Sequence, residues 1–443
     1  MDFQQLYQSK LVTPEEAVKV VKGGDWVEYG SFSGGVVALD RALAARKDEL
    51  QDVKVRATTR LGIPEIVKAD PEARVFTYNN WHFSGTDRKA HDQGTCWYIP
   101  MLYHELPGYY RQFLDVDVVM IPVAPMDEHG YFNFGPQCSH TMAMCEKGKT
   151  IILEVNKNIP RCLGGKEEGI HISMVDYIVE DDTPVPQVSS APPSEVDEVI
   201  AALIMNELED GSCLQLGIGG MPNAIGEMIA KSDLKDLGIH TEMFVDSMVD
   251  MVEAGVLTGA RKNLDKYKIV FAFAMGTQKT YDFINNNSMC ATYPVNYTND
   301  PFIICQNDKV VAVNNCVEVD LTGQVCSESS GTRHISGTGG QVDFTFGAYR
   351  SKGGKAFICL SSTFGKGDKL ASRIKPILTP GATVTTPRMM TSYLVSEFGM
   401  VNLKGMSTWQ RAEAIISLAH PQFRDELIKG AEETGIWRPS NKR

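Results

Sequence analysis

The run Gly217-Ile218-Gly219-Gly220-Met221-Pro222-Asn223-Ala224-Ile225 connects an apolar stretch, Cys213 to Leu216, to a predicted helix from Ala224 to Ala230. A strand that enters a glycine turn and then a helix leaves backbone N–H groups and the positive end of the helix dipole at one place. Such a place can bind a phosphate or the oxyanion that forms during acyl transfer. An ordinary tight turn is the alternative, because adjacent glycines are common at strand–helix junctions.

Better-known motifs do not fit this run. A dinucleotide fingerprint has its third glycine where this chain has Pro222. No Walker pattern is present, and the absence of a Gly-x-Ser-x-Gly elbow argues against a serine hydrolase. The histidines and the ten scattered cysteines show no ligand spacing. We therefore expect no metal and no redox cofactor.

A glutamate further along the chain is a candidate nucleophile. Glu242 lies in a second strand-like run, Ile239 to Val245, and Met243 and Phe244 follow it. A carboxylate can attack an acyl group and divide a transfer into two easier steps, and partial desolvation makes it more reactive. The alternative is a surface or ion-paired glutamate, which is the commoner role. Our interpretation is that Glu242 and the glycine run face each other across one active site.

The composition excludes several functions. The chain has 443 residues, 43% of them hydrophobic and 22% charged, with a net charge of −12. These values are typical of a globular protein of two or three domains. Without a basic block, nucleic acid binding is not expected. The sequence shows no signal peptide and no membrane-spanning run, and free cysteines fit a cytoplasmic protein.

The apolar pattern predicts an α/β protein. Continuous apolar runs are typical of parallel strands that are covered on both faces. Strands are predicted at 26–29, 53–58, 74–78, 116–123, 150–155, 213–216, 239–245, 269–274, 310–314, 356–360 and 382–386. Helices are predicted at 14–21, 37–46, 195–208 and 224–230, with a final pair within 408–433. The strand–glycine–helix order at 26–46 recurs at 213–230, which hints at two halves of similar architecture.

A proline- and serine-rich segment divides the chain. Residues 181–194 lack apolar periodicity and contain four prolines. We predict an N-terminal domain at 1–187, a linker at 188–194 and a C-terminal domain at 195–443. Two further features of the second domain are the run Ser336 to Phe344 and Lys366 between two glycines. The run is a second glycine cluster with amide and carboxylate side chains, or else a flexible turn between strands. Lys366 either meets a phosphate as a mobile point charge or is a solvated loop lysine.

Several long segments together resemble the acetate-dependent CoA-transferases of the acetyl-CoA hydrolase/transferase family. The similar segments are Met1 to Phe3, Val123 to Gly135, Glu154 to Arg161, Leu214 to Ala224, His240 to Met243, Ile335 to Phe344 and Ala419 to Arg424. The butyryl-CoA branch looks nearer than the 4-hydroxybutyrate branch, chiefly through Gly219 to Asn223 and the ending Ile436 to Arg438. Matches of this length and order are more specific than any single glycine loop.

The resemblance implies a fold, a reaction and a set of site residues. The family has two similar open α/β domains of the NagB/RpiA/CoA-transferase type, with the active site between them. Glu242 falls on the family's catalytic glutamate, and Gly217, Ile218, Gly219, Gly220 and Met221 fall on its CoA-binding loop. Gly340 and Lys366 fall on segments that line the CoA site. Loops at 81–85 and 126–132 would supply the acyl pocket.

The implied function is CoA transfer between a short-chain acyl-CoA and acetate, by a ping-pong reaction through a glutamyl-CoA thioester, in fermentative butyrate formation. CoA thioesters are then substrates, no cofactor is needed, and a homodimer or higher homo-oligomer is expected. Two departures, at Phe398 and within Tyr29 to Val37, bear on acyl specificity. A 4-hydroxybutyryl-CoA transferase, an acyl-CoA hydrolase and a non-catalytic CoA-binding protein remain as alternatives.

Overall fold

The structure is a computed structural model that describes residues 2–441, so Met1, Lys442 and Arg443 lie outside it. The chain forms two compact units. The first comprises the residues up to Ser189 together with Glu242–Asp246 and Lys268–Asn299. The second comprises Ser190–Thr241, Ser247–Tyr267 and the residues from Asp300 onward. The boundary at Ser189 falls within the predicted linker, but the prediction placed Glu242 and residues 268–299 in the C-terminal domain.

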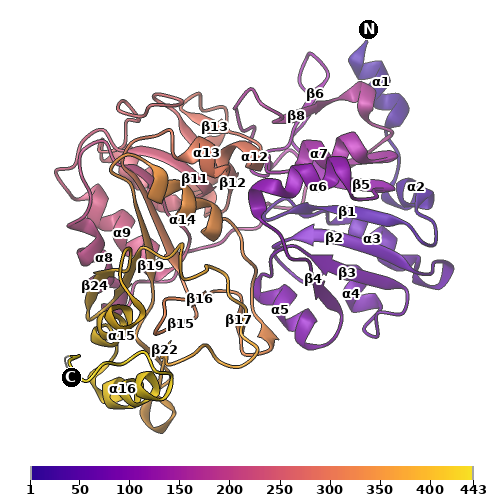
Figure 1. Cartoon of the computed structure of the whole chain (residues 1–443). Helices are drawn as coiled ribbons and strands as arrows, with labels where there is room; N and C mark the ends of the chain where they lie inside the picture. Colours follow the sequence, from indigo (N-terminus) through magenta and orange to yellow (C-terminus); the bar gives the residue numbers. More distant parts are fainter. Residues whose placement is uncertain (1, 442–443) are drawn as a thin grey trace. The chain divides into compact units, whose positions relative to one another are not determined.

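The first unit is built on a parallel sheet. Its strand order is β4-β3-β2-β1-β5-β7-β9, and every neighbouring pair in it is parallel (Figure 1). The strands of this sheet are β1 (Trp26–Ser31), β2 (Val53–Thr58), β3 (Phe76–Asn80), β4 (Cys96–Tyr98), β5 (Val118–Val123), β7 (Thr150–Val155) and β9 (Tyr177–Glu180). The unit also has two short pairs, β6 (Tyr131–Asn133) with β8 (Gly169–His171) and β12 (Ile269–Ala274) with β13 (Cys290–Thr292).

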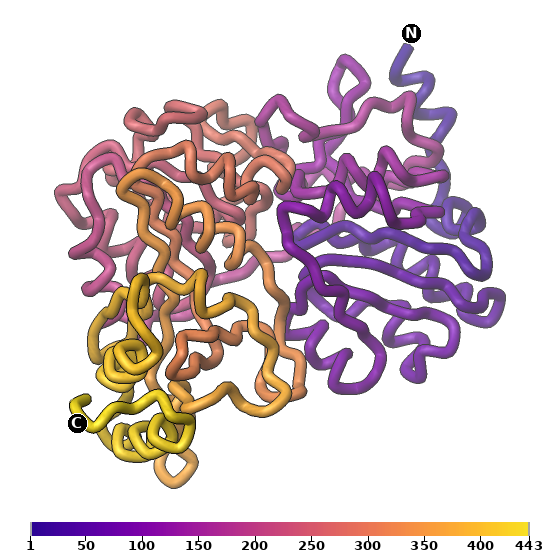
Figure 2. The backbone as a smooth tube through the Cα atoms, viewed as in Figure 1, coloured from indigo at the N-terminus to yellow at the C-terminus, as the bar shows by residue number. Residues whose placement is uncertain are grey.

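Helices cover both faces of this sheet. The helices of the first unit are α1 (Phe3–Lys10), α2 (Pro14–Ala17), α3 (Ala38–Ala45), α4 (Glu65–Ala69), α5 (Gly85–Asp92), α6 (Leu106–Gln112), α7 (Thr141–Lys147), α11 (Gln278–Ile284) and α12 (Val295–Thr298). Strand β5 is buried along its whole length, as expected of a strand between two helical layers. The N-terminal helix α1 contacts β9, so the start of the chain lies beside the sheet's last strand (Figure 2).

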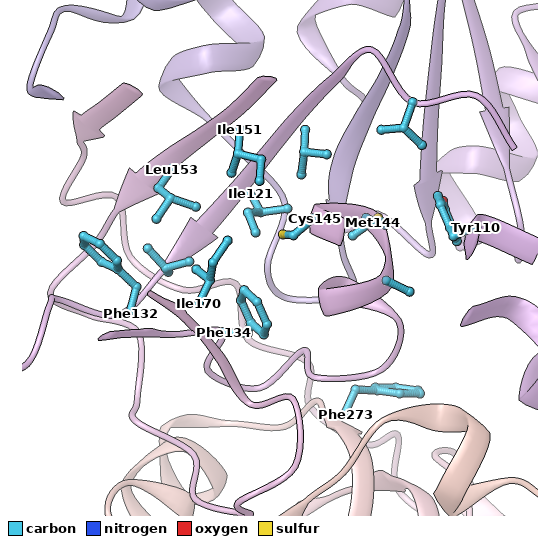
Figure 3. Close-up of a cluster of buried hydrophobic side chains, with 14 of the residues drawn as sticks. Tyr110, Ile121, Phe132, Phe134, Met144, Cys145, Ile151, Leu153, Ile170 and Phe273 are labelled. Atoms are coloured by element: carbon cyan, nitrogen blue, oxygen red, sulfur yellow. The ribbon is translucent and has the colours of Figure 1, made fainter. Parts of the chain in front are cut away.

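Each face of the sheet has its own hydrophobic core. One core contains Tyr110 of α6, Met144 and Cys145 of α7, and Ile121 of β5 (Figure 3). Phe132, Phe134 and Phe273 extend the same cluster (Figure 3). The other core gathers Tyr29, Leu39 and Val55 between β1, β2 and α3. Large side chains buried on both faces fix the sheet and so position the loops at its carboxyl edge.

The second unit repeats this architecture. Its central strands follow the order β11-β10-β14-β19-β23-β24, parallel except for the last pair. They are β10 (Cys213–Gln215), β11 (Gly238–Phe244), β14 (Val310–Asn315), β19 (Lys355–Cys359), β23 (Tyr393–Ser396) and β24 (Gly399–Asn402). Its helices are α8 (Glu195–Met205), α9 (Gly220–Ala230), α10 (Asp246–Glu253), α13 (Pro301–Ile304), α14 (Gln341–Arg350), α15 (Thr408–Ser417) and α16 (Arg424–Glu433).

Short antiparallel and mixed pairings complete the second unit. The strands are β15 (Glu318–Asp320), β16 (Val325–Cys326), β17 (Ser329–Ser330), β18 (Arg333–His334), β20 (Thr363–Phe364), β21 (Ala371–Ser372) and β22 (Ile374–Lys375). The predicted α/β class with two similar units is confirmed. The strand predicted at 382–386 is wrong, because within it only Thr386 pairs, as an isolated bridge to Val325.

Candidate active site

Glu242 occupies the second half of β11, where its carboxylate is half-buried. The Asn299 side-chain amide donates to Glu242 Oε2 at 2.7 Å. Asn299 is the C-cap of α12 and is fully buried, and its side-chain oxygen Oδ1 accepts from Thr298 Oγ1 at 3.0 Å. That second bond fixes which end of the amide faces the glutamate. Glu242 is therefore an oriented carboxylate, as a nucleophile must be.

The residues that follow Glu242 anchor it in the first unit. Met243 packs against the core drawn in Figure 3, and Phe244 is fully buried. The Phe244 ring stacks on Phe283 of α11, with centroids 5.8 Å apart and planes 7° from parallel. Apolar packing on these positions holds the strand in place and lowers the exposure of the carboxylate to water.

The glycine loop presents unused backbone donors. The amides of Ile218, Gly219, Gly220 and Met221 donate no hydrogen bond to any residue between 2 and 441. Gly219 is the N-cap of α9, a helix of eleven residues, and no side chain caps it. Unsatisfied N–H groups at a helix start, together with the helix dipole, favour an anion or a developing oxyanion. The predicted strand–turn–helix arrangement is confirmed here.

Glycine is required in this loop by conformation and by close approach. Gly219 has φ of 129°, in the left-handed region that disfavours any side chain. A Cβ at Gly220 would stand 2.7 Å from Asp197 Oδ2 of α8. A Cβ at Gly217, by contrast, would meet no atom within 4 Å. The loop is open on the side of Gly217 and closed on the side of α8.

Strand β11 reaches the glycine loop within the second unit. Thr241 Oγ1 donates to the carbonyl of Leu216, at 3.4 Å, and Leu216 immediately precedes Gly217. β10 and β11 run parallel, with Cys213 opposite Gly238. The glycine loop and Thr241 of β11 therefore lie at the same edge of the sheet. Open α/β sheets bind ligands at this edge, beyond the carboxyl ends of their strands.

A buried lysine packs against β11. Lys262 is 2% exposed, and its Nζ donates to the carbonyl of Ile239 in β11 at 2.9 Å. Burial lowers the pKa of this ammonium. Its side chain fills the space beside Gly238, where a Cβ would come within 2.5 Å of Lys262 Cγ. This lysine therefore has a structural role.

Comparison with known proteins identifies the family. The acetyl-CoA hydrolase/transferase N-terminal domain matches residues 1–189, and the C-terminal domain of that family matches residues 276–431. The chain belongs to the acetyl-CoA hydrolase/transferase family. The butyryl-CoA:acetate CoA-transferase of Anaerostipes caccae is 55% identical over 446 residues, which is 100% of each chain. The 4-hydroxybutyrate coenzyme A transferase of Clostridium kluyveri is 42% identical, covering 97% of this chain and 98% of that one.

The fold is that of solved members as well. The crystal structure of RipA from Yersinia pestis superposes with a TM-score of 0.90 at 37% identity, covering 98% of this chain and 100% of that one. The predictions of the family, of the fold and of an enzyme of the CoA-transferase class are confirmed. The greater identity to the butyryl-CoA relative agrees with the branch that the sequence favoured.

The other two predicted site residues of this acetyl-CoA hydrolase/transferase family member lie on separate elements of the second unit. Gly340 is the N-cap of α14. Lys366 is exposed in the turn between β20 and β21, between Gly365 and Gly367. Met221 lines a cavity of about 290 Å³ with Ser361 and Arg373. Neither Gly340 nor Lys366 is among its lining residues, so their role stays a prediction.

The predicted aromatic loops of the first unit divide into buried and open parts. Trp81 and Phe83 are 2% and 3% exposed and belong to the hydrophobic cores. Met126 lines a cavity of about 600 Å³ together with Tyr7 and Lys157. Among these loops, the segment around Met126 therefore offers a surface to a ligand.

Three further observations concern cysteines, metals and membranes. All ten cysteines are free, and eight of them are buried. Within residues 2–441 no group of three or more His, Cys, Asp or Glu side chains is arranged to hold a metal ion. No helix in that range is both long and apolar enough to cross a membrane.

Sequence reasoning missed Asn299 and Asp197. Asn299 lies far along the chain from Glu242, and nothing in its neighbours, Thr298 and Asp300, distinguishes it. Asp197 lies in the first turn of α8 and forms a capping box with Ser194. Its second role, as the wall behind Gly220, depends on how α8 packs on α9.

Proposed function

We propose that this enzyme moves CoA between butyryl-CoA, or a similar short-chain acyl-CoA, and acetate through a covalent intermediate on Glu242. The observation that carries the proposal is the oriented, half-buried carboxylate of Glu242, hydrogen-bonded by Asn299 at 2.7 Å. Full-length identity of 55% to a butyryl-CoA:acetate CoA-transferase supports the choice of substrates.

The reaction is written as two half-reactions. Glu242 attacks the acyl-CoA carbonyl, and the CoA thiolate leaves to give an acyl-glutamyl anhydride. The thiolate then attacks the glutamyl carbonyl, which releases the carboxylate product and leaves a glutamyl-CoA thioester. Acetate attacks this thioester, and the same steps run in reverse to acetyl-CoA and free Glu242. Each group that leaves in one step returns in a later one, so the sequence is ping-pong and balanced.

The glycine loop is assigned the stabilising role. Every addition step places negative charge on a former carbonyl oxygen, and the amides of Ile218 to Met221 have no other acceptor among the described residues. Preorganised amides that meet such an oxyanion stabilise the transition state more than the ground state. Gly340 and Lys366 are assigned to the CoA site on the resemblance alone.

An acetate-dependence assay tests this function. The enzyme is mixed with butyryl-CoA with and without acetate, and acetyl-CoA and free thiol are measured separately. The proposal predicts acetyl-CoA formation that depends on acetate, with little free thiol. Release of thiol at the same rate without acetate would instead show hydrolysis, a reaction that the family's name also includes.

The preferred acyl group is then determined by assaying a panel of acyl-CoA donors. Butyryl-CoA is compared with acetyl-CoA, hexanoyl-CoA and 4-hydroxybutyryl-CoA, because the 42% identical relative is named for 4-hydroxybutyrate. The proposal predicts the highest kcat/KM for butyryl-CoA. A higher value for 4-hydroxybutyryl-CoA would assign the chain to the other branch.

A further inference from the structure

Arg60 is buried in the first unit with one of its guanidinium nitrogens unsatisfied. It follows β2 and is 8% exposed. Nη2 donates to the carbonyl of Val36 at 2.6 Å and to Asp40 Oδ2 at 3.0 Å. Nη1, by contrast, has no hydrogen-bond partner anywhere in residues 2–441. Because buried polar groups almost always have partners, a buried donor without an acceptor points to a ligand.

The space in front of this nitrogen exists because residue 35 is glycine. A Cβ at Gly35 would stand 3.0 Å from Arg60 Nη1 and 3.3 Å from Cζ, and its three nearest atoms would all belong to Arg60. The amides of Gly35 and Val36 also donate no hydrogen bond within the described chain. They precede α3, whose own first turn is already bonded by Glu154. A guanidinium nitrogen and two amides thus lie unused beside Gly35.

The loop that contains Gly35 packs on the same core as the segment that carries Glu242. Phe32 stacks on Phe273, with ring centroids 3.5 Å apart and planes 4° from parallel. Both rings belong to the hydrophobic cluster against which Met243, the residue after Glu242, packs. The unused donors and the candidate nucleophile are therefore parts of one unit and are attached to one core.

We propose that Arg60 Nη1, with the amides beside Gly35, binds the carboxylate of the short-chain acid that accepts or leaves CoA. A guanidinium offers planar, fixed donors that match a carboxylate, and glycine at position 35 puts no side chain in front of Nη1. The assignment rests on the proposed function, which it deepens by naming the carboxylate subsite.

The acidic residues around Arg60 do not prevent it from binding a carboxylate through Nη1. Asp40 is its direct ion-pair partner, at 3.0 Å, on Nη2. Glu154 and Asp87 are the other carboxyls whose charge Arg60 influences, and burial raises the pKa of both, that of Glu154 to about 7. The donors on Nη1 are not used by any of the three.

The variant Gly35→Ala tests the site with little other change. Gly35 does not have a φ in the left-handed region, so alanine fits the backbone, and its methyl group only crowds Nη1. We expect the KM for acetate to rise at least about tenfold, as for loss of one charge-assisted hydrogen bond. The KM for butyryl-CoA and the midpoint of thermal unfolding stay unchanged. The matched control is Gly108→Ala in α6 of the same unit, whose Cβ would meet only the Gln112 side chain, at an ordinary 3.7 Å.

A binding measurement separates this inference from the proposed function. Line broadening of carbon-13-labelled acetate by the free enzyme is recorded for wild type and for Gly35→Ala. Loss of broadening in the variant supports the site even if the wild type transfers no CoA. The proposal is overturned if the wild type transfers CoA while Gly35→Ala keeps the same KM for acetate and the same line broadening. In that case Arg60 Nη1 binds an ordered water only. In Arg60→Lys, which keeps the charge but loses the fork, acetate binding should also weaken.

Discussion

The two glycine loops of this chain have the same strand–glycine–helix order but different surroundings. In the first unit a Cβ at Gly30 would stand 1.7 Å from the carbonyl of Gly34, and one at Gly34 would stand 2.2 Å from the Gln137 side chain. In the second unit Gly217 has no atom within 4 Å of such a Cβ. The first loop is largely filled by protein, whereas the second is open.

The helix that follows each loop shows the same difference. In the first unit the amides of Val37 and Leu39 donate to Glu154 at 2.8 and 2.9 Å, so a carboxylate from β7 occupies the start of α3. In the second unit the first amides of α9 meet no acceptor in the described residues. The helix start is therefore occupied by a protein carboxylate in one half and left open to an anion in the other, and the surroundings decide which.

The open loop is assigned to catalysis only because Glu242 is assigned as the nucleophile. The largest expected effect therefore comes from removing this carboxylate. Glu242→Gln keeps the shape and the acceptor for Asn299 but removes the nucleophile. We expect folding and CoA affinity to survive while kcat falls at least about a thousandfold. Steady-state transfer and CoA titration on the same preparation check this. Near-normal turnover would remove Glu242 from the mechanism.

A side chain in the open loop should affect catalysis more than stability. Gly219→Val places a branched residue at φ of 129° and crowds the amides, so we expect a loss of about a hundredfold in kcat/KM, similar to loss of an oxyanion donor. Gly255 is the matched control, because it also has positive φ, 77°, and open space. Gly255→Val should lose similar stability with no kinetic effect. Equal kinetic losses would assign the effect to backbone strain.

Alanine at one position in each loop sharpens the contrast. Gly34→Ala forces a methyl group into Gln137 and should cost about 1–3 kcal/mol in the free energy of unfolding. Gly217→Ala meets nothing and should leave that free energy unchanged while it lowers the rate modestly. Urea unfolding and steady-state kinetics of both variants measure this. A reversed order of the two stability losses would contradict the account of filled and open loops.

The smallest expected effect is on the pH dependence of folding stability, through Glu154 at the start of α3. Burial raises the pKa of Glu154 from 4.5 to about 7. The folded protein therefore holds this proton where the unfolded chain has lost it, and stability falls as the pH rises from about 4.5 to about 7. Glu154→Gln cannot ionise, so its urea midpoint should fall less across that window, though it starts lower because one amide loses its acceptor. Parallel pH curves for the two proteins would refute the assignment.

The fold was predictable where the apolar pattern is continuous. The predicted strands at 53–58, 150–155 and 269–274 match β2, β7 and β12 residue for residue, because parallel strands between helical layers leave an unbroken apolar signal. The error at 382–386 has a physical reason as well. Val384 is 40% exposed, so the apolar residues of this stretch do not mark a buried strand.

The site was predictable only in part. The glycine run and Glu242 follow from local chemistry combined with the family resemblance. Asn299, Glu154 and Arg60 act through contacts between distant parts of the chain, which no local pattern encodes. The grouping of Glu242–Asp246 and 268–299 with the first unit likewise depends on tertiary packing. The predicted homo-oligomer, the cytoplasmic location, the absence of a cofactor and the butyrate-forming direction stay predictions.

The most direct test of the central claim is to trap the intermediate. The enzyme is incubated with butyryl-CoA without acetate, reduced with borohydride and digested, and the peptides are mapped by mass spectrometry. The account predicts a single reduced side chain, at Glu242, that is absent from the Glu242→Gln variant and lost when acetate is added before the reductant. An active enzyme with an unmodified Glu242, or with the reduced residue elsewhere, would contradict it.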